Sequence, residues 1–208
     1  MKQTIITLGV IAFVGACATL ACNSDHTAST KTEGLTPVAI SQDSLINHGR
    51  YLVTIMGCND CHSPKKMGPM GPEIDTAHLL SGHPAKMPLG KIDAASLKSW
   101  VLFNQTQTAV VGPWGVSYAA NLTSDASGIG NWSEEQFFTA LRKGKYKGME
   151  GGRTLLPPMP WQTIGAASDH DLRSIFAYLK STQPVENVVP AATPPNALAM
   201  VSLGQSSN

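Results

Sequence analysis

Apolar residues recur at helical spacing in three stretches of the chain, and each stretch predicts an amphipathic helix. The second stretch begins at Ser133 and stops at Gly144, and the third begins at Ser168 and ends before Pro184. The first runs from about residue 44 to 57, with an apolar face that consists of Leu45, Ile46, Gly49, Leu52, Val53 and Met56. We therefore expect an all-α fold.

The starts of the second and third helices carry capping signals. Ser133 is followed three residues later by Gln136, and Ser168 by Asp171. A serine hydroxyl at such a position can accept a bond from the backbone N–H three residues on, while the later side chain bonds back. These pairs place the two helix starts at residues 133 and 168.

The stretch over residues 63–131 lacks helical periodicity. It is rich in Gly and Pro and shows only a weak helical pattern over 94–103 and weak strand patterns over 107–111 and 117–120. So long an irregular segment needs something other than its own secondary structure to hold it. A bulky buried cofactor would supply that support.

The first residues have the pattern of an export signal. Lys2 precedes an apolar run over residues 5–20, and a polar stretch follows from Asn23. The small residues before Cys17 and before Cys22 both resemble a bacterial lipoprotein box, in which the cysteine is lipidated and becomes the new N-terminus. A simple cleaved signal and an uncleaved membrane anchor are the alternatives, since the run is close to spanning length.

The cysteine count favours lipidation at Cys22 over Cys17. The chain has four cysteines, and the other two are Cys58 and Cys61. Cleavage before Cys22 removes Cys17 and leaves only the second pair, with no stray thiol in an oxidising compartment. The expected location is therefore periplasmic or extracytoplasmic, with a membrane tether through Cys22.

The chain of 208 residues divides into four parts on this basis. They are a signal peptide of lipoprotein type over 1–21, a flexible tether over 22–40, a folded domain over 41–183 and a Pro-rich tail over 184–208, which we expect to be extended or disordered. The formal net charge is only +1, so no basic field exists to attract nucleic acid. We expect no nucleic-acid partner.

The strongest chemical signal is the CxxCH motif formed by Cys58, Cys61 and His62. Two cysteines three apart at the end of a helix lie on one face, where their thiols can add to the two vinyl groups along one edge of a haem. His62 then falls where its imidazole can reach the iron. The motif predicts one covalent haem c, attached through Cys58 and Cys61, with His62 as the proximal iron ligand.

Three other interpretations of the cysteine pair are weaker. A structural zinc site needs four ligands, and the sequence has no second CxxC and no paired histidines at zinc spacing. A thioredoxin-like pair requires a βαβ context, which the helix and loop pattern denies. A plain disulfide is the simplest alternative, and the export signal, the helix leading in and His62 together favour haem over it.

Met159 is the candidate for the other axial position of the iron. It lies in the segment LPPMPW of residues 156–161, where prolines on both sides fix a non-helical course that presents a side chain at a defined place. A thioether ligand raises the reduction potential and favours electron transfer, whereas an open position permits small-molecule binding. The alternative is a methionine that only fills the core.

Other side chains are weaker candidates for binding the iron or for contacting the haem propionates. The remaining methionine candidates are Met149, Met67, Met70 and Met87. The histidines that we expect to be solvated or capping are His48, His78, His83 and His170. Weak candidates for contact with the haem propionates are Arg50, Arg153 and Trp132.

Five further blocks carry a family resemblance. They are GRYL at 49–52, NLTSD at 121–125, GIGNWS at 128–133, LLPPMPW at 155–161 and IFAYL at 175–179. With the CxxCH motif they resemble the class I, mitochondrial-type cytochrome c superfamily over nearly all of residues 41–183. Within it, the chain is similar to the cytochrome c domains of bacterial membrane dehydrogenases for alcohols, gluconate and related substrates.

The resemblance implies a class I cytochrome c-like fold with long Gly/Pro-rich loops around one covalent haem. It also implies that His62 and Met159 are the axial pair, and that the first and third helices cross closely where Gly49 allows the approach of Tyr178. The dehydrogenase subunits commonly carry three such domains, whereas this sequence has one CxxCH. A stand-alone carrier or a small partner subunit is therefore favoured over the dehydrogenase role itself.

The expected function is single-electron transfer by a His/Met-ligated monohaem cytochrome in an extracytoplasmic respiratory or dehydrogenase chain, and not enzymatic catalysis. The expected partners are redox proteins, with a membrane dehydrogenase or oxidase among the candidates. Two alternatives stay open. One is a five-coordinate haem sensor or enzyme that binds a small ligand, and the other is an electron-carrying docking subunit of a membrane dehydrogenase.

Overall fold

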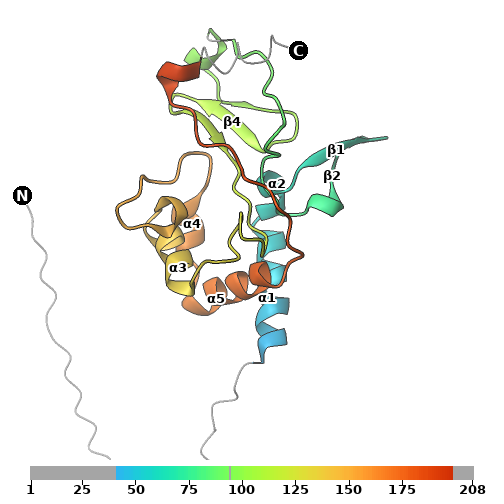
Figure 1. Ribbon diagram of the computed structural model, residues 1–208, viewed down its shortest axis with the longest axis vertical. Helices are drawn as coiled ribbons and strands as arrows, with labels where there is room; N and C mark the ends of the chain where they lie inside the picture. The colour runs from blue at the N-terminus through green and yellow to red at the C-terminus, as the bar shows by residue number, and fades with distance from the viewer. Residues whose placement is uncertain (1–40, 94, 199–208) are drawn as a thin grey trace, which may run out of the picture. The chain divides into compact units, whose positions relative to one another are not determined.

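The computed structural model describes residues 41–93 and 95–198 (Figure 1). The expected signal peptide, the tether and both lipidation candidates, Cys17 and Cys22, lie outside these residues. Within the described ranges, no helix combines the length and the apolar character that crossing a membrane requires.

Three helices enclose the main core, at the places that the sequence predicts. α1 spans Gln42–Ile55, α3 spans Glu134–Arg142 and α5 spans Asp169–Lys180. The buried residues of this core are Leu52, Val53, Leu80, Ile129, Phe137, Leu141, Leu172, Ile175 and Leu179. Leu80 and Ile129 come from the irregular stretch, so the loops complete the core that the helices begin.

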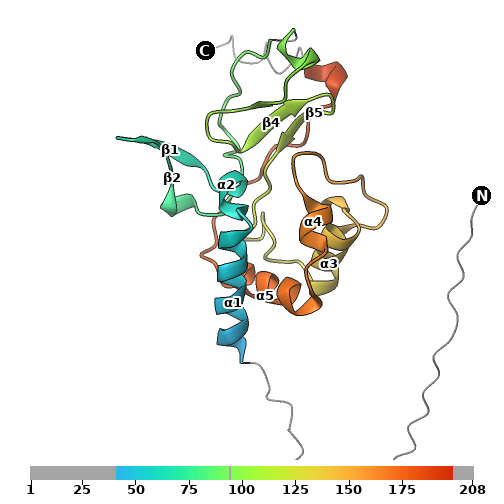
Figure 2. The same cartoon turned by 180° about the vertical axis from the view of Figure 1, so that it is seen from behind.

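The α1 and α5 helices cross at backbone contact, and both views of the ribbon show α5 running across α1 (Figures 1 and 2). A Cβ atom at Gly49 would lie 1.8 Å from the carbonyl oxygen of Ser174 and 2.8 Å from the Cβ of Tyr178. No side chain fits in that space. The close approach implied by the family resemblance is confirmed.

Serine residues cap both predicted later helices. In α5, Ser168 accepts from the Asp171 N–H and Asp171 bonds back, which completes a capping box. In α3, Ser133 accepts from the Gln136 N–H at 3.1 Å, but the Gln136 side chain donates to the Lys147 carbonyl at 2.8 Å instead of bonding back. An N-cap of this kind stabilises a helix by about 1 kcal/mol.

Two antiparallel sheets show that the expectation of an all-α fold is wrong. One is a hairpin of β1 and β2, and the other has the strand order β3-β4-β5. The strands are β1 Lys65–Gly68, β2 Gly71–Ile74, β3 Leu102–Phe103, β4 Ala109–Gly112 and β5 Gly115–Tyr118. The domain is therefore a helical core with added β structure, and β4 and β5 overlap the two weak strand patterns.

The second sheet has a small core of its own, which explains why it forms. Its buried residues are Leu89, Ala109, Val111 and Val116. The helix expected over 94–103 is wrong, since only Ser96–Lys98 form a 3₁₀ turn before β3 begins. Trp100 and Phe103 are exposed there, so the apolar residues of this stretch do not form a stripe against a core.

The remaining regular elements are short. Two of them are α-helices, α2 at Cys58–His62 and α4 at Trp161–Gly165. The other 3₁₀ turns are Thr76–His78, Tyr146–Gly148 and Pro195–Ala197.

Residues 184–198 follow an extended course, and side-chain bonds tie them to neighbouring loops. The Asn187 side chain donates to the carbonyl oxygens of Ser81 and His83, at 2.7 and 2.9 Å. Further on, Thr193 forms a bridge to β5. Side-chain bonds to loop carbonyls therefore hold this segment, although its Pro-rich sequence has no periodic pattern. Residues beyond 198 lie outside the described part.

Candidate functional site

Gly57 separates the helix that leads in from the helix that carries the cysteines. Its φ of 67° lies in the left-handed region, which glycine adopts without steric cost. α1 therefore ends at Ile55, and Cys58–His62 form the separate helix α2. The first helix thus ends close to its predicted end at about residue 57, and the cysteines lie on a short helix of their own.

His62 is buried, and one backbone carbonyl fixes the orientation of its ring. Nδ1 donates to the carbonyl oxygen of Ala120 at 2.8 Å. Because a carbonyl can only accept, the proton is on Nδ1 and the lone pair of Nε2 is left for a metal ion. Burial also lowers the pKa of His62, which favours the neutral, metal-binding form. This is the arrangement of a histidine ligand.

Asn121 holds the loop that carries the Ala120 carbonyl. Its amide donates to the carbonyl of Val185 at 2.8 Å and to the Ser127 hydroxyl at 3.1 Å, while its Oδ1 accepts from the Thr123 N–H at 2.9 Å. Sequence reasoning found the NLTSD block only through the family resemblance. The signal it missed is an Asn two residues before Thr, which is typical of an Asx turn.

Cys58 and Cys61 are free thiols on α2, and both are partly buried. Burial raises the pKa of Cys58 to about 11 and also raises the pKa of Cys61. Burial thus favours the protonated form of both thiols. Cys58 packs against the main core.

Met159 lies in the proline-bounded turn just before α4. Its backbone N–H donates to the carbonyl of Leu156 at 3.3 Å. The side chain is partly buried and packs against the same core as Cys58. Together with Pro157 and Trp161, it lines a cavity of about 360 Å³. Cys58 and Met159, which are far apart in the sequence, therefore pack against the same core.

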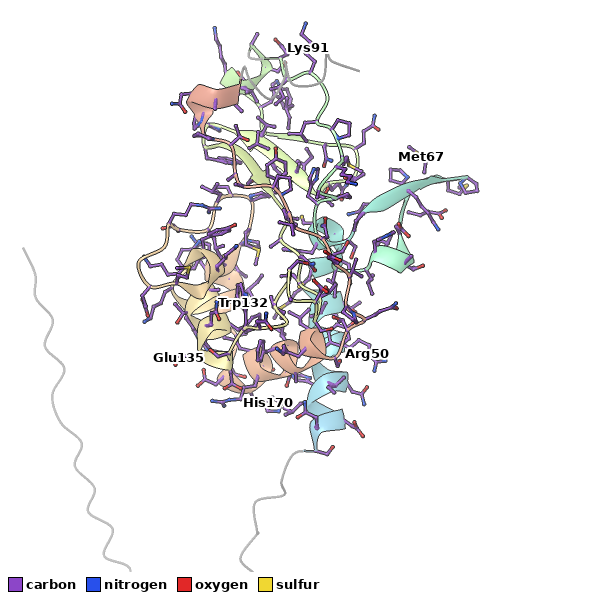
Figure 3. The ribbon with its side chains drawn as sticks, in the orientation of Figure 1. Arg50, Met67, Lys91, Trp132, Glu135 and His170 are labelled. Carbon is purple, nitrogen blue, oxygen red and sulfur yellow. The ribbon has the colours of Figure 1, made fainter. Side chains whose placement is uncertain are left out.

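The other methionine candidates lie in less suitable places. Met67 and Met70 are 73% and 95% exposed on the β1–β2 hairpin, and Figure 3 shows Met67 near the end of this projecting arm. Met149 is 60% exposed. The sulfur of Met87 accepts a bond from the Asn104 amide at 3.7 Å. None of these packs against the main core beside Cys58.

His83 differs from the expectation of a solvated side chain. It is fully buried, its Nδ1 lies 2.8 Å from the Thr108 hydroxyl, and its ring centroid lies 4.9 Å from that of Tyr118. His78 is exposed and bonds to Asp75, as a solvated histidine would.

The three propionate candidates have other contacts. Arg50 is exposed on α1 and donates to Asn47 at 2.7 Å (Figure 3). The Arg153 guanidinium lies 3.8 Å from the ring centroid of Tyr146. Trp132 packs against the main core. Each of the three side chains thus has a contact other than a shared propionate site.

The donor set would fit a haem of the c type. Two thiols lie on one short helix, a buried imidazole with a free Nε2 follows them directly, and a thioether packs against the same core. These are the groups that a c-type haem site uses for attachment and for axial ligation. The chemistry is that of the cytochromes c.

The chain is similar to the cytochrome c subunits of bacterial dehydrogenases, which confirms the resemblance drawn from the motifs. It is 29% identical over 139 residues, 66% of the chain, to the gluconate 2-dehydrogenase cytochrome c subunit of Pantoea cypripedii. It is also 29% identical over 139 residues, again 66% of the chain, to the cytochrome c subunit of the alcohol dehydrogenase (quinone) of Gluconobacter oxydans. The fructose dehydrogenase cytochrome subunit of Gluconobacter japonicus is 28% identical over 153 residues, 73% of the chain.

These relatives are much longer than the region of similarity. The chain covers 23%, 21% and 24% of their respective lengths. No family model matches the chain. The similarity supports an electron-transfer role of the cytochrome type.

Proposed function

We propose that this chain is a monohaem c-type cytochrome that transfers single electrons. Haem is attached through Cys58 and Cys61, and His62 and Met159 are the axial ligands. The observation that carries the proposal is the His62 ring, which Ala120 holds with Nε2 free immediately after two free thiols. The similarity to cytochrome c subunits supports the same role.

Each proposed ligand has a distinct task. Haem c, when bound, supplies an iron that takes up and releases one electron. His62 offers a neutral nitrogen whose orientation the Ala120 carbonyl keeps constant. Met159 offers a neutral sulfur, a soft donor that favours the reduced metal and raises the potential. Because α2 and the Met159 turn both pack against the main core, we expect little movement of these side chains on electron transfer.

The test of the ligand assignment is Met159→Ala in the haem-loaded protein. We expect the reduction potential to fall by on the order of 0.1 V, since the thioether is lost. We also expect carbon monoxide, which should leave the wild-type spectrum unchanged, to bind the reduced variant. Potentiometric titration and absorption spectra measure both effects.

Met149→Ala is the matched control, because Met149 is exposed and lies ten residues earlier in the same loop region. It should leave the potential and the carbon monoxide response unchanged. An unchanged potential in Met159→Ala would remove Met159 from the iron. A wild-type protein that itself binds carbon monoxide would favour the five-coordinate sensor.

The proposed partners are a redox donor and a redox acceptor, with a dehydrogenase as the donor. The support is that the relatives are cytochrome c subunits of dehydrogenases. Co-purification of the haem-loaded chain with a dehydrogenase would favour a docking subunit. The alternative outcome is that the haem-loaded chain purifies alone and that membranes supplied with a dehydrogenase substrate reduce its haem. This outcome would favour a stand-alone carrier.

The proposed location is extracytoplasmic, with a lipid on Cys22 as the membrane tether. Cys22→Ala should abolish incorporation of labelled fatty acid and move the protein to the soluble fraction, while Cys17→Ala should keep both properties. The reverse pattern would assign the lipid to Cys17. A wild-type protein without label would indicate a simple cleaved signal or an uncleaved anchor.

A further inference from the structure

Two histidines and a carboxylate gather where the start of α5 meets α1. His48 comes from α1, and His170 and Asp171 come from the first turn of α5. Figure 3 labels His170 at this place. The Nε2 of His48 lies 2.7 Å from Oδ1 of Asp171, and the Nδ1 of His170 lies 3.9 Å from the same oxygen. One ligand atom from each residue lies within 4.8 Å of the other two.

We propose that His48, His170 and Asp171 bind one divalent transition-metal ion of the Zn²⁺ type. Zinc takes imidazole and carboxylate donors at about 2.0–2.2 Å, which puts neighbouring donors roughly 3.3 Å apart in a tetrahedral site. The separations of 2.7 and 3.9 Å lie on either side of that value, so small side-chain rotations bring the donors into place. Water completes the coordination.

The carboxylate of Asp171 is already oriented for this role. Its Oδ2 accepts from the hydroxyl and the N–H of Ser168, at 2.7 and 3.3 Å, through the capping box. Its Oδ1 therefore faces the two histidines. Bonds from His48 and Ser168 lower the pKa of Asp171, so the carboxylate is ionised at neutral pH. Outer hydrogen bonds of this kind orient metal ligands in proteins.

The surroundings decide the kind of ion and the strength of binding. Two of the three donors are nitrogens, which suits Zn²⁺, Ni²⁺ or Cu²⁺ and not Mg²⁺ or Ca²⁺. The positive end of the α5 dipole opposes a cation, so binding is weaker than at a closed structural site. The neighbouring carboxylate of Asp169 is paired with Arg142 at 2.6 Å and does not join the cluster.

The site is accessible, and it would join two distant parts of the chain. The side chains of His48 and His170 are 36% and 46% exposed, so an ion can reach them from solvent. His48 and Asp171 are 123 positions apart in the sequence. A bound ion would therefore cross-link α1 to α5 and stabilise the crossing at Gly49.

The experiment is calorimetric titration of the full-length, haem-loaded protein with ZnCl₂, after removal of any affinity tag. We expect one equivalent to bind, with MgCl₂ giving no heat of binding. His48→Ala and His170→Ala should each weaken the binding at least about 10-fold. His78→Ala is the matched control, since His78 also bonds to a carboxylate, at 2.6 Å, but has no third donor among the described residues.

Thermal unfolding gives an independent readout. Zn²⁺ at about 100 times its dissociation constant should raise the unfolding midpoint by on the order of 5 °C in the wild type and in His78→Ala, but not in His170→Ala. If His48→Ala perturbs the helix crossing, His48→Gln keeps a polar side chain there and carries the test. Binding that survives both histidine substitutions, or the absence of a stoichiometric site, would overturn the proposal.

Discussion

Asn121 is 4% exposed and lies in the loop that positions His62. Its side chain both donates and accepts hydrogen bonds. Its amide reaches the Val185 carbonyl, and its oxygen receives the N–H of Thr123. A substitution would therefore remove the acceptor of the Thr123 N–H and one of the donors to the Val185 carbonyl, which also accepts from the Thr123 hydroxyl at 3.4 Å. An unsatisfied buried group costs about 1–3 kcal/mol.

Asn121→Ala should lower the free energy of unfolding by about 3 kcal/mol, as measured by urea denaturation. The control is Asn131→Ala, because Asn131 is exposed and should change stability by less than about 0.5 kcal/mol. Equal losses in the two variants would mean that the Asn121 bonds do not hold the loop.

Asp125 gives the stability a dependence on pH. Bonds from the side chain and the N–H of Ser127 lower the pKa of this carboxyl below its ordinary value of 3.8. The ionised form is thus favoured by folding, and its contribution is present above the ordinary pKa and is lost as pH falls through the lowered one.

Asp125→Asn should therefore be less stable than the wild type at pH 6, and the difference should shrink below about pH 4. Unfolding curves of both proteins between pH 2 and 6 measure this convergence. A difference that stays constant over the whole range would contradict the assignment.

At the scale of residues, the sequence predicts groups whose chemistry is local. The spacing of Cys58, Cys61 and His62 identifies a haem site without any structure. The carbonyl of Ala120 could not be foreseen, because every residue carries a carbonyl and only the fold selects one. The burial of His83 was likewise hidden, since its Thr108 and Tyr118 neighbours come from a distant strand region.

At the scale of elements, the crossing of α1 with α5 depends on the absence of a side chain at Gly49. Gly49→Ala should destabilise the domain by roughly 2–3 kcal/mol, because its Cβ would overlap the carbonyl oxygen of Ser174. Chemical denaturation measures the loss. Gly90→Ala is the control, since a Cβ at Gly90 would meet nothing within 4 Å. Similar stability in both variants would show that α1 and α5 can move apart at Gly49 without a large loss of stability.

The same scale shows which elements a sequence can predict. Each of the helices α1, α3 and α5 has one apolar face and a serine at its N-cap. The helical period of the apolar residues and the capping residue therefore indicate the same helix. β4 is buried at all four positions, so it lacks the alternation by which a half-buried strand is recognised. The helical pattern predicts an end near Gly57, but it does not show that a second short helix, α2, begins directly after the positive φ of this glycine.

At the scale of the whole molecule, Asn187 connects the C-terminal segment to the loop after the β hairpin. Its amide donates to two carbonyls, and its oxygen accepts from the N–H of Ala85 at 3.0 Å. Asn187→Ala should cost about 2 kcal/mol and expose residues 184–198 to proteases. Limited proteolysis followed by mass spectrometry measures the exposure. The exposed Asn196 supplies the control, Asn196→Ala, and equal cleavage in both variants would disprove the connection.

The distance along the chain between α1 and α5 also sets an order of events during folding. The core against which Cys58 packs takes Leu172, Ile175 and Leu179 from α5, the last α-helix of the described chain. Contacts so distant in sequence form late, because a long loop must close first. Until then, Cys58 lies on an open chain where burial does not raise its pKa. The burial that raises the pKa of Cys58 is therefore a property of the closed domain and depends on α5 being in place.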